Sequence, residues 1–277
     1  MRPLLVVDGD SFAHRAYHAL PKSMRRENGG PGNALIGFTN MLLRLWSDER
    51  PRTVLVAWDT LDVPTYRHTA LAAYQSGRVF DGELLEQLDL LPAMVRSAGF
   101  ACAKEAGYEA DDFLAAAAAQ EETAGGMALV ATSDRDAFQL VTDRVTVLQP
   151  ARGAPPARID PDAVRERYGV DPAQVPDFIA LRGDPSDKIP GARGIGQKRA
   201  ADLLGQYASL DELLDNGRFA TEADALRLYR SIATMDRDAP LPPLPDVVPD
   251  WERAAAHARE LGLEQDARRF EEVRTWT

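Results

Sequence analysis

Acidic side chains recur along this chain directly after short apolar runs, where strands of a sheet would end. They are Asp8, Asp59, Glu109, Asp111, Asp112, Asp134, Asp136, Asp184 and Asp187. Carboxylates that come together from distant segments repel one another and are costly to bury unless cations hold them. Carboxylate oxygens are ligands that Mg²⁺ and Mn²⁺ favour. The simplest chemistry for this set is therefore a site for two or more hard divalent metal ions.

Some of these acids have other interpretations. Asp8-Gly9-Asp10-Ser11 resembles the nucleophile loop of the haloacid dehalogenase phosphatases, and Gly183–Asp187 loosely resembles their last acidic motif. In that alternative Asp8 is a phosphorylated nucleophile and Asp10 a general acid. Acids in the first turn of a helix, as at Glu109–Asp112, also serve as simple caps. Against the phosphatase, Gly183 follows a helical pattern and several acids are left without a role.

A glycine-rich turn with basic residues is the most specific local motif. The run Pro190–Ala201 predicts that a helix ends, the chain turns through a hairpin, and a new helix begins near Gly196. Glycines let the backbone approach a phosphate, and a helix N-terminus offers free N–H groups. This helix-hairpin-helix pattern is typical of contact with a nucleic-acid backbone. The candidate DNA-binding residues are Lys188, Arg193, Gly194, Gly196, Lys198 and Arg199. The alternative is a plain helical hairpin whose lysine and arginine side chains are only solvated.

The segment from Thr60 to Gly82 predicts no regular element, and long segments of this kind are often functional. It contains Arg67, Tyr74 and Arg78. An aromatic ring beside an arginine suits stacking on a base and contact with a phosphate. The alternative is a surface loop with one packed tyrosine.

The elements that position these motifs form an α/β pattern. Strands are predicted at Leu4–Val7, Thr53–Trp58, Phe100–Ala103, Met127–Ala131 and Val145–Leu148, and helices at Asn33–Trp46, Leu84–Ala98 and Asp111–Gln120. Strands that alternate with helices predict a mostly parallel sheet covered on both faces. Ligands of such sheets gather at the carboxyl ends of the strands. From Asp160 to Met235 the pattern predicts short helices, and two more follow Pro249.

Composition limits the class of protein. The chain has 277 residues, 45% of them hydrophobic, and a single cysteine, Cys102, which excludes a disulfide framework. No signal peptide or membrane span is predicted, and a cytoplasmic monomer is expected. A net charge of −11 argues against a nucleic-acid binder. That argument weakens if the acids converge on metal ions, because bound ions reverse the local field.

Together, and in this order, the motifs resemble the 5′-nuclease (flap endonuclease) superfamily, above all the bacterial branch typified by the N-terminal domain of DNA polymerase I. The matching stretches are Val7–Asp10, Ala57–Asp59, Tyr66–His68, Tyr74–Arg78, Gly107–Asp112, Thr132–Asp136 and Leu181–Asp187 with the hairpin. The resemblance covers nearly the whole chain and implies a stand-alone nuclease of PIN-like fold. It implies one domain, 1–277, with a metal-binding core (1–165), a hairpin region (166–235) and C-terminal helices (236–277).

The resemblance also implies roles for individual residues. One ion would lie among Asp8, Asp59, Glu109 and Asp111, and a second among Asp134, Asp136, Asp184 and Asp187. Asp112 would lie between the two ions or behind the residues that bind them. Residues 60–88 would form a helical arch for a single-stranded 5′ end, with Tyr74 stacking on a nucleotide and Arg78 and Arg67 stabilising the phosphate. The hairpin would hold K⁺. One departure stands out, because Gln75 occupies the position of a family lysine.

The activity so implied is two-metal hydrolysis of DNA at 5′ flaps, nicks and 5′ ends, as a flap endonuclease and 5′→3′ exonuclease in repair and replication. RNA primers in RNA–DNA hybrids are a further expected substrate, and a DNA polymerase an expected partner in the bacterial cytosol. Besides the phosphatase, two alternatives stay open: a non-catalytic junction-binding protein, favoured only by Gln75, and an RNA-directed nuclease.

Overall fold

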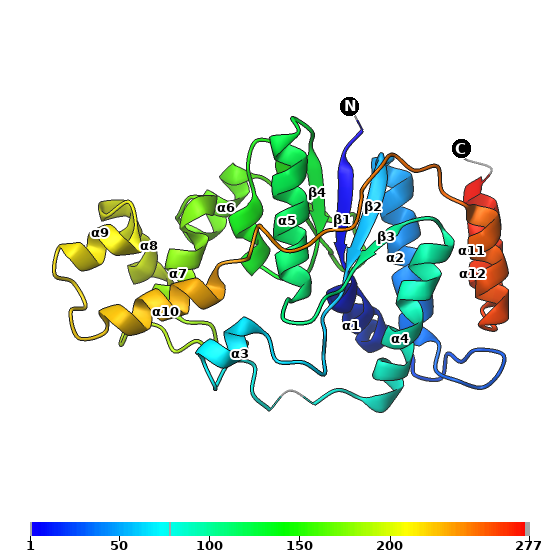
Figure 1. Cartoon of the computed structure of the whole chain (residues 1–277), viewed down its shortest axis with the longest axis horizontal. Helices are drawn as coiled ribbons and strands as arrows, with labels where there is room; N and C mark the ends of the chain where they lie inside the picture. The colour runs from blue at the N-terminus through cyan, green and yellow to red at the C-terminus, as the bar shows by residue number, and fades with distance from the viewer. Residues whose placement is uncertain (1, 78, 275–277) are drawn as a thin grey trace.

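A computed structural model describes residues 2–77 and 79–274. Its centre is a six-stranded sheet with the strand order β3-β2-β1-β4-β5-β6 (Figure 1). The strands are β1 (Leu4–Asp8), β2 (Thr53–Ala57), β3 (Ala101–Ala103), β4 (Ala128–Ala131), β5 (Val145–Gln149) and β6 (Ala157–Ile159). The pairs from β3 to β5 are parallel, and β6 is antiparallel to β5. The predicted, mostly parallel sheet is confirmed.

Both faces of the sheet are covered, and alternate residues of each strand enter different cores. Leu4 and Val6 join the core on one face, while Leu5 and Val7 join the core on the other. The first face packs against α5 (Ala110–Thr123), α6 (Pro161–Tyr168) and α7 (Val175–Arg182). The second face is covered by α1 (Gly9–Ala19), α2 (Asn33–Glu49) and α4 (Gly82–Ser97). Helices α11 (Trp251–Glu260) and α12 (Glu264–Arg274) pack on the outer side of α2 and α4 (Figure 1). Strands buried on both faces explain the continuous apolar runs in the sequence.

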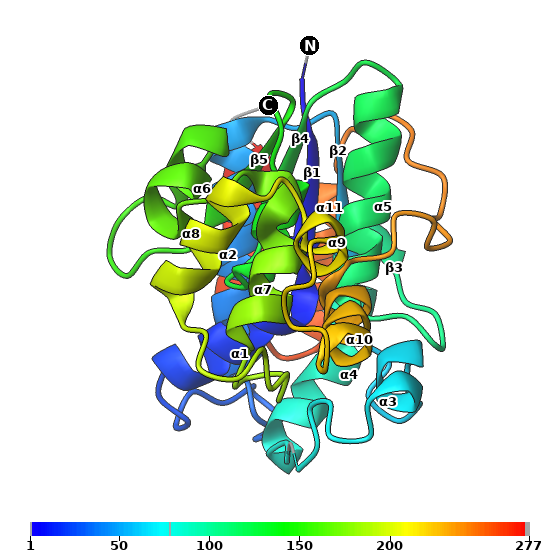
Figure 2. The same ribbon diagram turned by 90° about the vertical axis from the view of Figure 1, so that its left-hand side faces the viewer.

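Short helices form a lobe beside the sheet, as the sequence predicts for 160–235. Beyond α7 it contains α8 (Gln197–Gln206), α9 (Leu210–Asp215) and α10 (Ala223–Ala233), and it faces the viewer in Figure 2. Two short 3₁₀ helices, η1 (Asp136–Leu140) and η2 (Pro172–Gln174), lie between the lobe and the sheet. The proline-rich segment after α10 then crosses back to α11 (Figure 1). Arg52 fastens it, with Nη1 donating to the Leu244 carbonyl at 2.7 Å.

Four elements are absent from the prediction, one of them the 3₁₀ helix η1. Helix α1 begins inside the Asp8–Asp10 motif, and its apolar residues are mostly small. Strand β6 is a three-residue edge strand with only Ile159 buried. Helix α3 (Tyr66–Ala70) is a five-residue helix inside the segment predicted to be irregular. Strand β6, helix α3 and η1 are too short to produce a clear periodic pattern. In α1 the buried residues do follow helical spacing, and the prediction overlooked it: Gly9, Phe12, Ala13, Ala16 and Tyr17.

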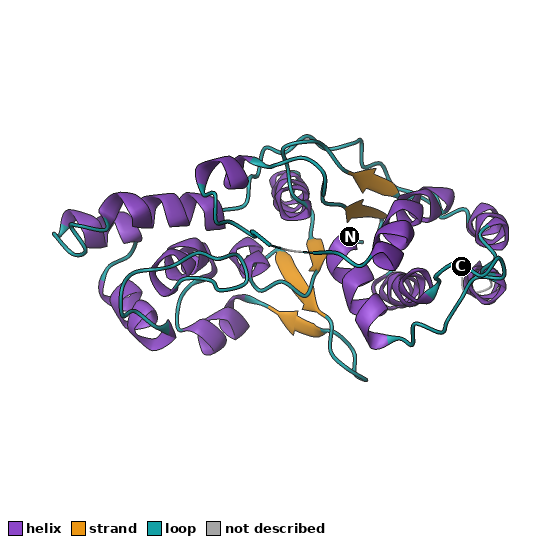
Figure 3. Ribbon diagram, turned by 90° about the horizontal axis from the view of Figure 1, so that it is seen from below, coloured by secondary structure: helices purple, strands orange, loops and turns teal. Residues whose placement is uncertain are grey.

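The strand order places a topological switch point beside β1. The chain proceeds from β1 through β2 to β3 on one side and continues through β4 and β5 on the other. A crevice forms at the carboxyl ends of strands where the order reverses. The carboxyl ends of these strands point toward the lower side of Figure 1, where α3 lies. Figure 3 shows the molecule from that side. No helix within residues 2–77 and 79–274 combines the length and apolar composition needed to cross a bilayer.

Candidate metal centre

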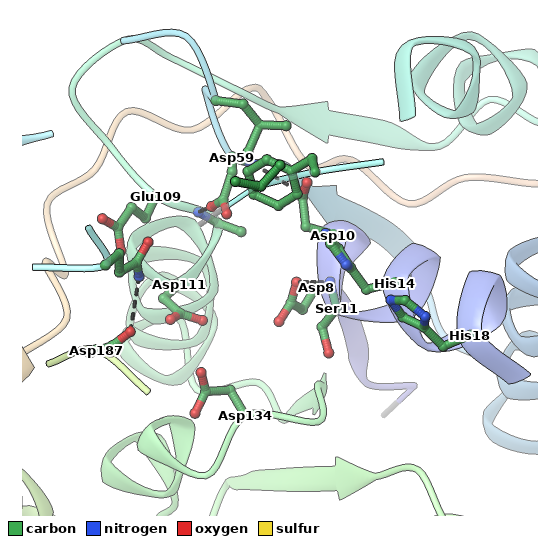
Figure 4. Close-up of a pocket in the computed structure, with 15 residues that line it drawn as sticks. Asp8, Asp10, Ser11, His14, His18, Asp59, Glu109, Asp111, Asp134 and Asp187 are labelled. Atoms are coloured by element: carbon green, nitrogen blue, oxygen red, sulfur yellow. Dashed lines mark hydrogen bonds between the residues drawn. The ribbon is translucent and has the colours of Figure 1, made fainter. Parts of the chain in front are cut away.

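A pocket of about 430 Å³ opens at the carboxyl ends of the central strands. Its wall carries most of the predicted metal ligands: Asp8, Asp59, Glu109, Asp111, Asp134 and Asp187. Figure 4 shows these carboxylates around the cavity, arriving from β1, the loop after β2, the start of α5, the loop after β4 and the loop after α7. The predicted convergence of residues far apart in sequence is thus what the fold produces at this edge of the sheet.

Asp8 is held rigidly where β1 turns into α1. Its Oδ1 accepts a hydrogen bond from the Ser11 backbone N–H at 2.9 Å, which caps α1. Its Oδ2 accepts from the Thr132 hydroxyl at 2.7 Å, which links the ends of β1 and β4. Ser11 Oγ in turn accepts from the Ser133 N–H at 3.1 Å. Both strand ends are therefore locked around the carboxylate.

Asp59 and Asp10 link the next loops. The Asp59 carboxylate accepts from the Ala110 N–H at 2.7 Å, at the first residue of α5. The Asp59 N–H donates to Asp10 Oδ2 at 2.8 Å. Asp10 is 8% exposed and lines the pocket, although the sequence assigns it a role only in the phosphatase alternative. His14 and His18 of α1 also line the pocket (Figure 4). Their spacing of four residues places them on one face of a helix, and this spacing is the feature of the sequence that could have indicated a shared position.

The electrostatics of the pocket favour cations. Burial, with smaller contributions from Asp59 and Asp134, raises the pKa of Asp8 to about 7, against the hydrogen bonds from Ser11 and Thr132. Burial and neighbouring carboxylates also hold the pKa values of Asp10, Asp111 and Asp136 well above their usual range. No lysine or arginine lines the described wall of the pocket, although Arg67, behind the wall, lies 3.4 Å from Glu109 (Nη1–Oε2) and opposes the rise that burial causes in the pKa of that carboxyl.

The donor set fits hard divalent ions, because it consists of carboxylate oxygens that repel one another. As placed, no three His, Cys, Asp or Glu side chains of the described chain converge closely enough to form a coordination group. The assignment of individual ligands is therefore a proposal that depends on donor chemistry and on the position of each residue at the pocket.

Two predicted ligands of the second ion lie beside the pocket instead of on its wall. Asp136 is the first residue of η1, and besides burial the charges of Asp134, Asp184 and Asp187 raise its pKa. Asp184 is 9% exposed and accepts from the Ser186 N–H at 2.8 Å and from Arg182 Nη2 at 3.1 Å. The influence of the other three acids on Asp136 shows that the four lie near one another, with Asp134 and Asp187 on the pocket wall and Asp136 and Asp184 beside it.

Asp112 and Arg67 lie behind the pocket wall, next to Glu109, with Arg67 Nη1 3.4 Å from Glu109 Oε2. For Asp112 this is one of the two positions that the resemblance implies, whereas Arg67 is not placed to meet a phosphate in the pocket. Arg67 Nη1 and Nη2 donate to the two oxygens of Asp112 at 2.8 and 2.7 Å, and both side chains are almost fully buried. Arg67 Nε also donates to the Ile232 carbonyl at 2.9 Å. Asp112 does not line the pocket, and Arg67 does not point into it. This pair fastens the arch segment (residues 60–88) to α5 and to the end of α10.

Tyr74 is also placed differently from its predicted stacking role. It is 4% exposed, and its hydroxyl donates to Glu109 Oε2 at 3.0 Å. Its ring meets His68 edge-on, with centroids 5.2 Å apart. A tyrosine buried in this way positions Glu109 and has no open face for a base. Arg78, the other predicted catalytic residue of the arch segment, lies outside the described residues.

The hairpin forms as predicted, and its turn depends on two glycines packed back to back. Gly183 and Gly191 have φ values of +79° and +73°, and a Cβ on Gly183 would lie 2.7 Å from the Pro190 carbonyl oxygen. Reciprocal backbone hydrogen bonds of 2.8 Å between Asp184 and Ile189 close the turn. Beyond it, α8 starts at Gln197 without a side-chain cap. The exposed residues of the hairpin loop (183–196) and the first turn of α8 include Arg193, Gly194, Gly196, Lys198 and Arg199.

Comparison with known proteins identifies the class. Residues 3–169 match the family model for the 5′-3′ exonuclease N-terminal resolvase-like domain, and residues 170–251 match that for the 5′-3′ exonuclease C-terminal SAM fold. DNA polymerase I of Mycobacterium bovis is 40% identical over 268 residues, which are 92% of this chain and 30% of that protein. The thermostable DNA polymerase I of Thermus thermophilus is 38% identical over 249 residues, covering 86% of this chain and 29% of the polymerase. The chain thus spans about a third of the length of these relatives.

Solved structures support the same fold at lower identity. The T5 D15 protein co-crystallised with metal ions superposes with a TM-score of 0.72 at 18% identity and covers 98% of this chain and 99% of its own. Human GEN1 in complex with Holliday junction DNA superposes with a TM-score of 0.62 at 14% identity, covering 98% and 71%. The fold and the acidic pocket at the strand ends agree with these family models. The chain belongs to the 5′-3′ exonuclease family. This membership is at odds with the phosphatase alternative.

Proposed function

We propose that this chain is a structure-specific nuclease that hydrolyses DNA phosphodiesters at 5′ flaps, nicks and 5′ ends, with RNA primers as a further substrate. The observation that supports it best is the pocket at the strand ends, whose described wall carries carboxylates from five distant segments and no Lys or Arg. Such a pocket attracts an anionic phosphodiester only after cations have reversed its field. The requirement for divalent metal is therefore part of the proposal.

In the proposal, Asp8, Asp59, Glu109 and Asp111 hold one ion, and Asp134, Asp136, Asp184 and Asp187 hold a second. When bound, Mg²⁺ or Mn²⁺ would acidify the attacking water and neutralise charge on the phosphate. The chain itself supplies fixed orientation. Asp8 cannot rotate without breaking its bonds to Ser11 and Thr132, and Glu109 is held by Thr65 and Tyr74. Asp112 and Arg67 serve the fold of the arch segment and are left out of the catalytic set.

Substrate recognition is assigned to the exposed hairpin loop and α8. The basic side chains of Arg193, Lys198 and Arg199 would contact phosphates of the DNA duplex independently of its sequence. K⁺ would bind the backbone carbonyls of the hairpin. Lys188 is a weaker candidate, because its Nζ already donates to Ser76. Action as a monomer in the bacterial cytosol, together with a DNA polymerase, completes the proposal.

The test uses a duplex with a single-stranded 5′ flap, labelled at its 5′ end, with Mg²⁺, Mn²⁺ or EDTA. Metal-dependent release of a fragment of flap length is expected. Asp134→Ala should lower the cleavage rate by about 100-fold or more while the protein stays folded, because a lost ligand removes several kcal/mol of charge stabilisation. Asp143→Ala, at an exposed acid away from the pocket, is the matched control. Binding of the flap without cleavage under any divalent metal would favour the junction-binding alternative.

A further inference from the structure

Two residues other than glycine have left-handed backbone where the arch segment meets the hairpin loop. Gln75 has a φ of +46° and Lys188 a φ of +58°. This conformation is unfavourable for a residue with a Cβ and persists where surrounding contacts impose it, often at functional sites. The two segments contact each other directly at these residues.

The contacts are reciprocal. The Gln75 backbone N–H donates to the Asp187 carbonyl at 3.3 Å, and its side-chain Nε2 donates to Asp187 Oδ1 at 3.1 Å. The second bond is the dashed line that ends at Asp187 in Figure 4. In return, Lys188 Nζ donates to the backbone carbonyl of Ser76 and to its Oγ, the latter at 3.0 Å. The left-handed turn at Gln75 allows its backbone and its side chain to reach the same residue.

The same amide nitrogen has a second partner that extends the chain of hydrogen bonds across the pocket. Gln75 Nε2 donates to the Tyr74 hydroxyl at 2.9 Å, and that hydroxyl donates to Glu109 Oε2 at 3.0 Å. Both N–H groups of the amide are thus used. Glu109 belongs to the proposed ligands of the first ion and Asp187 to those of the second. A continuous relay, Asp187–Gln75–Tyr74–Glu109, therefore joins the two halves of the centre.

We propose that Gln75 is a positioning residue, which acts with Tyr74 to set the spacing between Glu109 and Asp187 and thereby the affinity of the centre for its divalent ions. The inference rests on the proposed function, since it requires metal in this pocket. A neutral amide suits the role because it orients Asp187 directly and Glu109 through Tyr74, and it adds no positive charge to compete with the ions. Gln75 is then a working part of this site and not a sign of lost activity.

The test measures Mn²⁺ binding to the DNA-free protein, by the electron paramagnetic resonance signal of free Mn²⁺, alongside flap cleavage as Mn²⁺ is varied. Gln75→Met keeps the side-chain length and removes both donors, and Tyr74→Phe removes only the hydroxyl. Loss of one hydrogen bond to a charged group corresponds to roughly tenfold or more in an equilibrium constant, so at least one Mn²⁺ is expected to bind about tenfold more weakly in each variant. Cleavage should recover as Mn²⁺ is raised. Gln120→Ala, at an exposed position of α5, is the control.

The outcomes separate the inference from the proposed function. Weaker Mn²⁺ binding in both variants, with Gln120→Ala unchanged, supports the positioning role. A lower melting temperature with parental Mn²⁺ affinity would show that the relay only stabilises the fold, and it would overturn the inference alone. A parent protein that neither binds Mn²⁺ nor cleaves the flap would overturn the proposed function and the inference with it.

Discussion

Replacing Arg67 by methionine tests whether this arginine serves the fold or the phosphate. The side chain is 2% exposed, and its guanidinium makes paired hydrogen bonds of 2.8 and 2.7 Å to Asp112. Without it, the fully buried Asp112 keeps backbone donors from Glu109 and Asp236 but loses its counter-charge. Removing one partner of a buried ion pair costs about 3–5 kcal/mol. For a chain of 277 residues that corresponds to a fall in melting temperature of roughly 5–9 °C.

The assay is urea denaturation of the parent, Arg67→Met, Asp112→Leu and the double variant. The double variant is expected to be more stable than the sum of the single effects predicts, because it removes both charges together. The proposed ligand Glu109 lies 3.4 Å from Arg67 but keeps its hydrogen bonds from Thr65 and Tyr74. Flap cleavage by folded Arg67→Met, measured well below its melting temperature, should therefore stay within about tenfold of the parent, a loss of about 1.4 kcal/mol at most. A variant with the parental melting temperature and a cleavage rate lowered 100-fold would refute this reasoning and would favour contact between Arg67 and the scissile phosphate.

Three further predictions follow from single contacts. Gly9→Ala places a Cβ 2.5 Å from the Trp58 ring, so urea denaturation should show a loss of about 1–3 kcal/mol, and parental stability would contradict the close approach. Burial raises the pKa of Asp266 from 3.8 to about 6, so ionisation of this carboxyl lowers the free energy of unfolding as the pH rises from about 4 to 6. Above pH 6, Asp266→Asn should therefore have a free energy of unfolding up to about 3 kcal/mol higher than the parent. A stability difference that does not change with pH would count against this reasoning. Lys198→Ala should reduce the salt dependence of duplex binding by about one phosphate contact with Mn²⁺ affinity unchanged, and an unaltered salt slope would exclude the proposed grip.

The fold could be predicted from sequence where the pattern was long and apolar. The five parallel strands were found because burial on both faces requires continuous runs such as Leu4–Val7. The hairpin was found because its glycines are set by local backbone geometry. Helix α3 and strand β6 were not found, because a few residues with one or two buried side chains depend on the rest of the fold.

For the candidate site, too, some features could be predicted from the sequence and others could not. The carboxylates at strand ends could be predicted to meet, since parallel strands end at a common edge. The side-chain directions of Arg67, Asp112 and Tyr74 could not, because each is decided by a partner far away in sequence: Asp112 lies 45 residues from Arg67, and Glu109 lies 35 residues from Tyr74. A residue type that suits phosphate contact suits a buried ion pair equally well.

By itself, then, the sequence determined the class of chemistry: a parallel sheet whose strands end in acids, a glycine-rich phosphate-binding turn, and a family pattern that spans the chain. These features are local or repeat along one strand or helix, so neighbouring residues suffice to specify them. Only the tertiary structure decided which carboxylates line the pocket, which arginine is buried, and that Gln75 connects Glu109 to Asp187. Those outcomes depend on hydrogen bonds and packing between segments that meet only when the whole chain has folded.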